Sequence, residues 1–389
     1  MLFNLKRTAA KPKEQKASAV GAHLAVHGAG RAVWSPRDSS SLTRLGYSGN
    51  AVVFRCVRMI AEAAAATPFR VLEDGVPMNT HPVMDLLSNP NAGQDGTGLL
   101  EALYSHLQLS GDAFLEAAGL NETGAPAELH VLRSDRMRVV PGPDGWPEAY
   151  DYAVGGRSHR FDMTTEAQPI LHVRSFHPQD DHYGLSPMKA AAAALDIHNS
   201  AGAWSKALLD NAARPSGAIV YNGESGAGMS DEQFRRLSEE LAASHQGARN
   251  AGRPLLLEGG LDWKPMGFSP SDMEFLKTKE AAAREIALAF GVPPQLLGLP
   301  GDNTYSNFQE ANRAFYRQTI LPLVRRTGGA IAGWLGWRYG SALALTPDLD
   351  QIPALSQERE AQWRRIAAAD FLDPDEKRQM LGLPPRSAP

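Results

Sequence analysis

Four side chains in the segment HPQDDHYG carry the donor atoms of a metal site: His177, Asp180, Asp181 and His182. Imidazole and carboxylate groups bind Zn²⁺ when three or four of them converge at about 2.0–2.2 Å from the ion. A site built from His177, Asp181 and His182 would make the protein a metal-dependent hydrolase. The spacing is that of a loop and not of a helical His pair, which favours a solvated polar loop without a metal.

Other catalytic motifs are missing from the sequence. No G-x-x-x-x-G-K-[ST] segment that would cradle a phosphate occurs, and the glycine-rich segments RTGGAIAG and YNGESGAG lack the lysine. No G-x-S-x-G nucleophile elbow occurs either. The single cysteine, Cys56, lies in VVFRCVRMIAEAAAA, where a buried core thiol is expected. The sequence therefore predicts a protein that is not an enzyme, has no catalytic residue and needs no cofactor.

The composition sets broad limits. A chain of 389 residues is long enough for two or three domains with ample buried core. The net charge of -4 and the pI of about 6.3 do not match an ordinary basic nucleic-acid-binding protein. No apolar run approaches the roughly 18 residues needed to span a bilayer, so no membrane partner is expected. One cysteine excludes an internal disulfide.

Helical and strand-like patterns alternate in the N-terminal half. Residues 1–45 are polar and contain Gly, Ser and Lys, which predicts a largely extended arm. Apolar residues at helical spacing predict helices over 50–66 and 98–109. Short runs separated by turn residues predict strands at 112–120, 128–133, 136–140, 148–154 and 168–174. This mixture is typical of an α+β domain.

Two long helices flank a small central module. Ser186 and Pro187 provide an N-cap and a first helical residue, and the alanine-rich sequence after them predicts a helix to about 211. The segment SPSD at 269–272 begins a second helix of about 20 residues. Between them, residues 215–268 contain strand-like runs and one capped helix. Two helices that leave one body and return to it form a stalk whose tip is this module.

A displayed loop follows the second of these helices. Gly291 stands where a left-handed C-cap belongs, and the two prolines that follow prevent the helix from continuing. Residues 301–305 are polar. Ser306 followed by Gln309 has the pattern of a capping box, which predicts that the next helix begins at 306. No residue pattern in this segment indicates a catalytic role.

These segments, in this order, resemble the HK97-type family of tailed-phage portal proteins. The likeness is carried by HPVMDLLSNPNAG at 81–93, LSGDAFLE at 109–116, ILHVRSFHPQDDHYGLSPM at 170–188, LLLEGGLDWKPM at 255–266 and the loop region at 285–324. Asp112 stands where the family usually has Asn. The chain is also similar to the portals of gene transfer agents, which are phage-derived particles.

The resemblance implies an α+β portal fold with a wing, a two-helix stem, an α/β clip, a tunnel loop and a short helical crown, assembled as a ring. The expected parts are an N-terminal arm 1–45, wing 46–185, first stem helix 186–214, clip 215–268, second stem helix 269–292, tunnel loop 293–305, long helix and return to the wing 306–345, and crown 346–389. In the crown, a helix near 356–369 precedes a short helix begun by Asp373, Pro374 and Glu376.

The resemblance also implies a function. The chain would form a dodecameric ring at one capsid vertex, through which double-stranded DNA is packaged and ejected. Its expected partners are its own copies, the terminase large subunit, a head–tail connector or adaptor protein, the major capsid protein and the passing DNA. The particle would be assembled in the host cytoplasm. The alternative is an oligomeric scaffold or adaptor without a DNA conduit.

DNA-facing residues are expected in the tunnel loop and on the second stem helix. By resemblance, the narrowest point is lined by Asp302, Asn303, Thr304, Tyr305, Ser306 and Asn307. The channel-lining candidates on the stem helix are Lys277, Lys279, Glu280 and Arg284. Mixed charge suits passage, because a continuous basic tunnel would hold DNA by counterion release. The clip, 215–268, would dock the terminase and then the connector.

Overall fold

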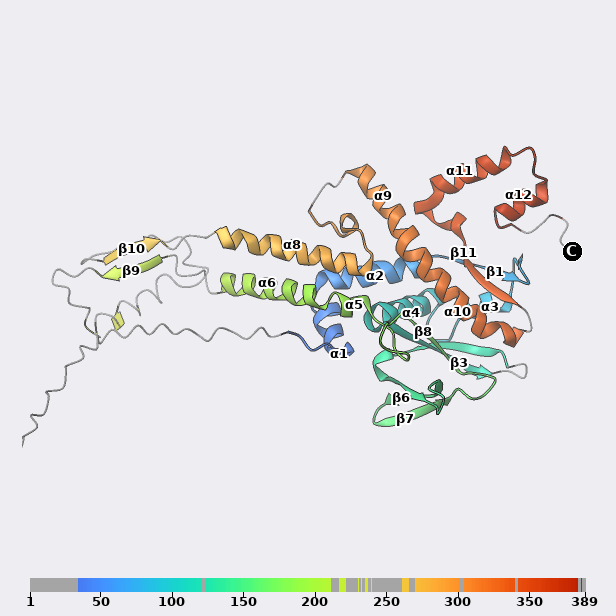
Figure 1. Cartoon of the computed structure of the whole chain (residues 1–389), viewed down its shortest axis with the longest axis horizontal. Helices are drawn as coiled ribbons and strands as arrows, with labels where there is room; N and C mark the ends of the chain where they lie inside the picture. Colours follow the sequence, from blue (N-terminus) through green and yellow to red (C-terminus); the bar gives the residue numbers. More distant parts are fainter. Residues whose placement is uncertain are drawn as a thin grey trace, which may run out of the picture. The chain divides into compact units, whose positions relative to one another are not determined.

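The structure, a computed structural model, describes most of the chain beyond residue 33. The described residues are 34–120, 124–210, 217–221, 230, 232, 235–236, 239, 261–265, 270–300, 304–339, 342–383 and 386. Figure 1 gives the order of the helices and strands along the chain. Within these ranges, no helix has the length and apolar character required to cross a membrane.

The end of the predicted arm is helical. α1 (Ser39–Leu42) begins after Asp38, whose carboxylate accepts the N–H of Ser41 at 2.9 Å. A π-helical turn, η1 (Thr43–Tyr47), follows it. The expectation of an extended segment up to residue 45 is wrong for 39–45, which are helical and bury Leu42 in the core. Residues 1–33 of the predicted arm lie outside the described residues.

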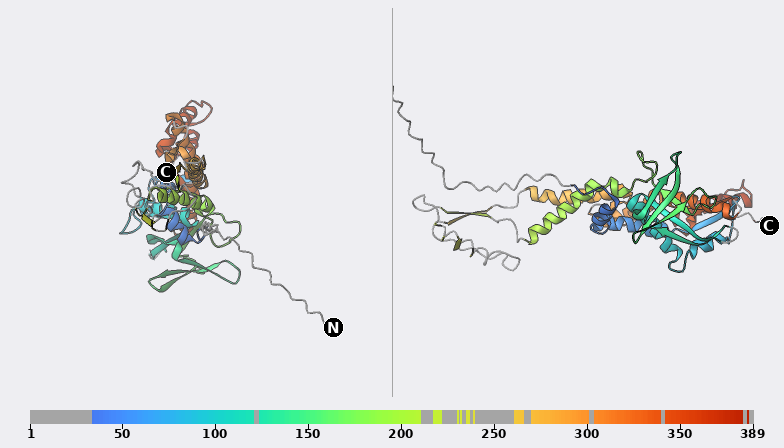
Figure 2. Two further views of the ribbon diagram at one scale, coloured as in Figure 1. Left: turned by 90° about the vertical axis from the view of Figure 1, so that its left-hand side faces the viewer. Right: turned by 90° about the horizontal axis from the view of Figure 1, so that it is seen from below.

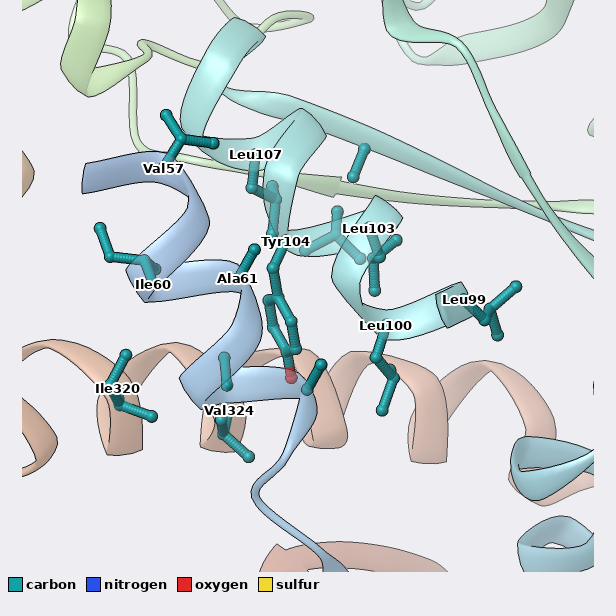
Figure 3. Close-up of a cluster of buried hydrophobic side chains, with 14 of the residues drawn as sticks. Val57, Ile60, Ala61, Leu99, Leu100, Leu103, Tyr104, Leu107, Ile320 and Val324 are labelled. Carbon is teal, nitrogen blue, oxygen red and sulfur yellow. The ribbon is translucent and has the colours of Figure 1, made fainter. Parts of the chain in front are cut away.

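The core is centred on three helices. α2 (Ala51–Ala65) is capped by Asn50, and α4 (Gly96–Ser110) is capped by Asp95. Both bury their apolar faces together with α10 (Leu321–Tyr339). Figure 3 shows the ring of Tyr104 among the aliphatic side chains of all three helices. Tyr104 is fully buried, and burial raises the pKa of its hydroxyl group. The helices predicted at 50–66 and 98–109 are therefore present.

Three antiparallel sheets pack beside this core. The first has the order β4–β3–β8, the second β5–β6–β7, and the third β11–β1–β2. Their bounds are β1 (Phe69–Glu73), β2 (Val76–Pro77), β3 (Asp112–Leu120), β4 (Pro126–Leu132), β5 (Met137–Pro141), β6 (Pro147–Val154), β7 (Arg157–Asp162), β8 (Ile170–Arg174) and β11 (Leu343–Pro347). The five strands predicted between 112 and 174 are present, and the structure adds β7, which was not predicted and has only Phe161 buried. The third sheet joins β1 to β11, a pairing between distant segments that no local pattern indicates.

The segment HPVMDLLSNPNAG has a structural role. His81 caps α3 (Pro82–Ser88), because its Nδ1 atom accepts the N–H of Val83 at 3.1 Å. The side-chain amide of Asn91 donates to the Leu129 carbonyl at 2.9 Å and so fixes the following turn on β4. These two side chains explain the His-Pro and Pro-Asn pairs of the motif by local hydrogen bonding.

Two segments cross at Gly111 and Gly184 without room for a side chain. Gly111 ends α4 with a φ of +84°, and a Cβ atom on it would lie 2.6 Å from the carbonyl carbon of Gly184. A Cβ atom on Gly184 would lie 2.0 Å from the carbonyl oxygen of Gly111. This crossing brings the turn before α5 against the start of β3.

Gly111→Ala is expected to lower the free energy of unfolding by about 2–4 kcal/mol, since a left-handed backbone and a backbone clash both oppose the methyl group. Gly145→Ala is the matched control. Gly145 has a φ of +85°, but a Cβ atom there would meet nothing within 4 Å. The control should lose only about 1–2 kcal/mol. Urea unfolding followed by circular dichroism compares them, and equal losses would contradict the clash.

The first long helix is divided in two. Ser186 caps α5 (Pro187–Ala190) by accepting the N–H of Lys189 at 3.0 Å, as the Ser-Pro pair predicts. The single helix expected over 186–214 is wrong, because Ala191 has a ψ of 1° and α6 (Ala192–Asp210) begins after it. Met188 and Leu195, on either side of the break, both pack at Gly46. Tertiary packing therefore interrupts the helix at Ala191, where the sequence has no Pro or Gly to signal a break.

The second long helix, α8 (Pro270–Phe290), lies beside α6 (Figure 1). The rings of Trp204 on α6 and Phe275 on α8 stack with centroids 4.3 Å apart. Figure 2 shows the two helices from two further directions. Between them in sequence, β9 (Gly217–Tyr221) and β10 (Leu261–Pro265) form an antiparallel pair. Most other residues of the module predicted at 215–268 lie outside the described residues.

The long helix predicted from 306 consists of three parts. α9 (Tyr305–Phe315) continues through a π-helical turn, η5 (Tyr316–Ile320), into α10, which ends at Tyr339. Two short helices follow β11, namely α11 (Ser356–Ala367) and α12 (Pro374–Met380). The short 3₁₀ turns are η2 (Ser134–Arg136), η4 (Pro294–Leu297), η6 (Leu349–Gln351) and η7 (Pro353–Leu355). The start of α12 is as predicted, because Asp373 and Glu376 form a reciprocal capping box.

One arginine attaches the C-terminal helices to the sheet. The guanidinium group of Arg70, on β1, lies 2.8 Å from a carboxylate oxygen of Asp348. It also donates to the carbonyl oxygen of Gly382, beyond α12, at 2.7 Å. These contacts hold the segment after β11 and the end of α12 against β1.

Candidate functional site at the loop between α8 and α9

The loop begins at a fixed point, Gly291. This residue has a φ of +67°, and the next N–H, of Val292, reaches back to the Ala287 carbonyl at 2.9 Å. The N–H of Gly291 bonds to the Leu288 carbonyl at 3.0 Å. The two bonds form a Schellman motif, which satisfies the last carbonyl groups of α8. The left-handed C-cap predicted at Gly291 is therefore confirmed.

The same point is attached to the helix that follows the loop. The hydroxyl group of Thr319, within η5, donates to the Gly291 carbonyl at 2.6 Å. A Cβ atom on Gly291 would lie 2.8 Å from that hydroxyl oxygen, so glycine also permits the close approach. The π-helical turn thus carries a side chain that holds the base of the loop. The sequence pattern indicated neither the turn nor the contact.

The loop is held again on both sides of residues 301–303. The Arg284 guanidinium group, on α8, donates to the carbonyl oxygen of Pro300. On the other side, the Thr304 hydroxyl oxygen accepts the N–H of Asn307 at 3.2 Å and caps α9. Between Pro293 and Pro300, η4 packs Leu296 and Leu297 against the core. The chain between Gly291 and Pro300 is therefore positioned by named contacts.

The predicted tunnel-loop residues fall into two groups. Asp302 and Asn303 lie outside the described residues. Thr304 is the N-cap of α9, and the first turn that follows is exposed and includes Tyr305, Ser306 and Asn307. The capping box predicted at Ser306 is wrong, as is the boundary at 306. Thr304 has the extended backbone and the accepting hydroxyl group that a cap requires, so the helix begins at Tyr305.

The four predicted stem residues do not share one environment. Lys277, Glu280 and Arg284 are exposed on α8, as a channel-lining position requires. Lys279 is half-buried and lies toward α6, with its Nζ atom 4.0 Å from the position of a Cβ atom on Gly202. Burial, and secondarily the charge of Lys279, lower the pKa of His198 on α6. Lys279 therefore faces α6 of the same chain.

Comparison with known proteins identifies the chain. Residues 51–382 match the family model described as phage portal protein. The chain belongs to the phage portal protein family. The predicted resemblance to HK97-type portals is confirmed, since the chain is 27% identical to the portal protein of Enterobacteria phage HK97 over 292 residues, which cover 73% of this chain and 66% of that protein.

The predicted similarity to gene transfer agent (GTA) portals is also confirmed. A chain in the neck of a native GTA particle, computed with C12 symmetry, is 63% identical with a TM-score of 0.73. The match covers 92% of this portal chain and 97% of that chain. A chain in the neck of an empty GTA particle, computed with C6 symmetry, is 63% identical with a TM-score of 0.75, covering 93% and 98% of the two chains.

The His177–His182 segment of this portal chain is a hydrogen-bonded loop. One oxygen of Asp180 accepts the N–H groups of His182 and Tyr183 at 2.9 and 3.0 Å. These backbone bonds lower the pKa of the Asp180 carboxyl group. The His177 ring accepts the N–H of Gln179 at 3.1 Å. Across the part of the chain that the structure describes, no three His, Cys, Asp or Glu side chains are grouped to hold a metal ion.

The sequence reasoning missed a buried polar network behind that loop. Asp112 Oδ1 accepts the N–H of Gly184 at 2.8 Å and the Nε2–H of His172 at 2.9 Å. Because the carboxylate has no proton to donate, this proton lies on His172 Nε2. His172 Nδ1 lies 3.2 Å from the Tyr150 hydroxyl group, whose pKa burial raises to about 12. The network joins β3, β6 and β8. The signal for it was Asp112, which stands in the portal motif LSGDAFLE.

Proposed function

We propose that this chain is the portal subunit of a GTA-like or tailed-phage particle. In this proposal it forms a dodecameric ring at one capsid vertex, and double-stranded DNA is packaged and ejected through the ring. The observation that carries the proposal is the 63% identity, over nearly the whole chain, to chains in GTA necks computed with C12 and C6 symmetry. Such a ring has heterologous contacts, in which one face of each copy meets a different face of the next.

The two helices α6 and α8 form the stem in this proposal, with α8 toward the channel. Their exposed faces differ in charge. On α6, the exposed positions from 193 to 206 are Ala193, Ile197, Ser200, Ala203 and Lys206, of which only Lys206 is charged. On α8, the exposed positions include four charged residues, Lys277, Glu280, Arg284 and Glu285. An aqueous channel suits the α8 face with its four charges, and contact with protein suits the largely uncharged face of α6.

The charges on α8 are of both signs, which supports passage of DNA without tight binding. Each phosphate neutralised by a cation adds affinity through counterion release. Alternating Lys277, Glu280, Arg284 and Glu285, repeated around a ring, give balanced bands and no continuous cationic surface. Contacts of this kind are made to phosphate and carry no base readout.

The loop between α8 and α9 is proposed as the narrowest part of the channel. Asp302, Asn303 and Thr304 in the loop, with Ser306 and Asn307 at the start of α9, suit sliding contact because they offer hydrogen bonds without concentrated positive charge. The anchors at Gly291 and Thr304 support this assignment, since they hold the ends of the loop. Residues 215–268 are proposed as the clip that docks the terminase large subunit and then a head–tail connector or adaptor.

The remaining parts follow the same scheme. Residues 46–185 form the wing, which faces the major capsid protein, and residues 346–389 form the short crown. The protein is located at the portal vertex of the particle and is assembled in the host cytoplasm. It acts without a cofactor and is not an enzyme.

Electron microscopy and light scattering of the purified chain test the proposal. The expected particle is a ring with an open centre and a mass near half a megadalton, from twelve chains of 42.0 kDa each. A closed oligomer without a central channel would contradict it and favour a scaffold or adaptor. A bound metal in stoichiometric amount, with hydrolysis that His182→Ala abolishes, would instead favour the hydrolase alternative.

A further inference from the structure

We propose that Leu288 of one subunit packs against Tyr305 and Phe308 of the neighbouring subunit. This contact would join the start of one loop to the end of the next around the ring. The inference rests on the ring in the proposed function and adds to it a specific pair of surfaces. It involves the last turn of α8 and the first turn of α9, the two helical ends that border the loop.

Each surface is apolar and uncovered within one chain. Leu288 is 79% exposed, whereas Ala287 and Phe290, in the same turn of α8, are buried in the core. Tyr305 is 80% exposed and Phe308 is 48% exposed. Residues three apart lie on the same side of a helix, so Tyr305 and Phe308 share one side of α9. The chain therefore presents an aliphatic side chain before the loop and an aromatic pair after it.

Duplex DNA is a poor match for Leu288. Most protein contacts to a duplex go to phosphate and sugar oxygens and are made by hydrogen-bond donors. Leucine has no donor, and an aromatic ring stacks on bases only where they are unpaired. The residues around Leu288 that do suit DNA or water are Arg284 and Glu285, which are exposed on the same helix. Leu288, Tyr305 and Phe308 are better matched by another apolar protein surface.

A second copy of the same chain supplies that surface. A ring with cyclic symmetry is built from heterologous contacts, so each subunit must carry two different patches that fit one another. The related chains that share 63% identity come from necks computed with C12 and C6 symmetry. Leu288 and the pair Tyr305 and Phe308 are two such patches. They lie on different elements, and both remain exposed within one chain, so neither satisfies the other there.

Cysteine cross-linking tests the contact in the full-length chain. The only native cysteine, Cys56, is fully buried, and burial raises the pKa of its thiol group to about 12. It will therefore stay unreactive. A chain with Leu288→Cys and Phe308→Cys together is assembled, oxidised and separated on a denaturing gel. The expected result is a ladder of covalent oligomers that extends to the full ring, while either single variant gives no product above a dimer.

The matched control pairs Phe308→Cys with Leu276→Cys. Leu276 is also an exposed leucine on α8, at 64%, but lies near the other end of the helix, so no ladder is expected. Rings seen by microscopy with no ladder from the Leu288→Cys and Phe308→Cys chain would overturn this contact and leave the portal ring intact. A cross-link within one chain would also overturn it. The absence of rings would remove both this contact and the proposed function.

Discussion

Asp112→Ala is expected to lower the free energy of unfolding by about 2–5 kcal/mol, because it leaves two buried donors without an acceptor. The donors are the N–H of Gly184 and the Nε2–H of His172, at 2.8 and 2.9 Å from the same carboxylate oxygen. The side chains of Asp112 and His172 are each only 7% exposed, so water does not replace the lost bonds. Thermal or urea unfolding followed by circular dichroism measures the loss.

Asp112→Asn is the matched control. The amide oxygen of Asn accepts the same two N–H groups in the same geometry, so the expected loss is under about 1 kcal/mol. If the Ala and Asn variants lost equal stability, the charge of Asp112 would matter and the hydrogen bonds would not. If neither lost stability, the network would have no role in folding.

Deleting residues 301–303 is expected to leave the ring assembled and to reduce retained DNA to the background measured without terminase. The deletion removes Gly301, Asp302 and Asn303 but keeps the two contacts that border them. These are the bond from Arg284 to Pro300 and the cap that Thr304 places on α9. Because the contacts at both borders are made by retained residues, we expect α8 and α9 to stay folded and the loss to be confined to DNA. Nuclease-protected DNA in assembled particles is the measurement.

A variant with three glycines at 301–303 separates loop length from side-chain chemistry. If the narrowing of the channel is what retains DNA, the glycine variant should package more DNA than the deletion. If Asp302 and Asn303 act through their side chains, the two variants should be equally impaired. Normal packaging by the deletion variant would remove the tunnel-loop assignment, while microscopy of both variants verifies that the ring is present.

Signals that lie within a few residues of one another predicted the structure well. Gly291 ends α8, Ser186 begins α5, and Asp373 with Glu376 begins α12, as expected from capping patterns. In each case the hydrogen bond that decides the element joins residues at most five apart in sequence. Five of the six strands between 112 and 174 were predicted for a similar reason, because turn residues separate short apolar runs, whereas β7 was missed.

One of these local patterns gave a wrong prediction, because two residues could cap the same helix. Thr304 and Ser306 are both able to cap a helix, and the pattern Ser306 with Gln309 pointed to the second. The structure uses Thr304, so Tyr305 and Ser306 belong to α9. Two hydroxyl residues so close together offer nearly equal local bonds, so the local pattern does not separate them.

The sequence by itself determined the family, the order of the elements and the position of the loop between α8 and α9, because these depend on short-range patterns and on an ordered series of motifs. Only the tertiary structure decided which side chains hold that loop and which face the other helix. Arg284 bonds to Pro300, Thr319 to Gly291, and Lys279 faces α6. The pairing of β1 with β11 and the bond between Asp112 and His172 are also of this kind. Such contacts join residues far apart in sequence, and folding brings them together through burial of the whole core, which no local pattern encodes.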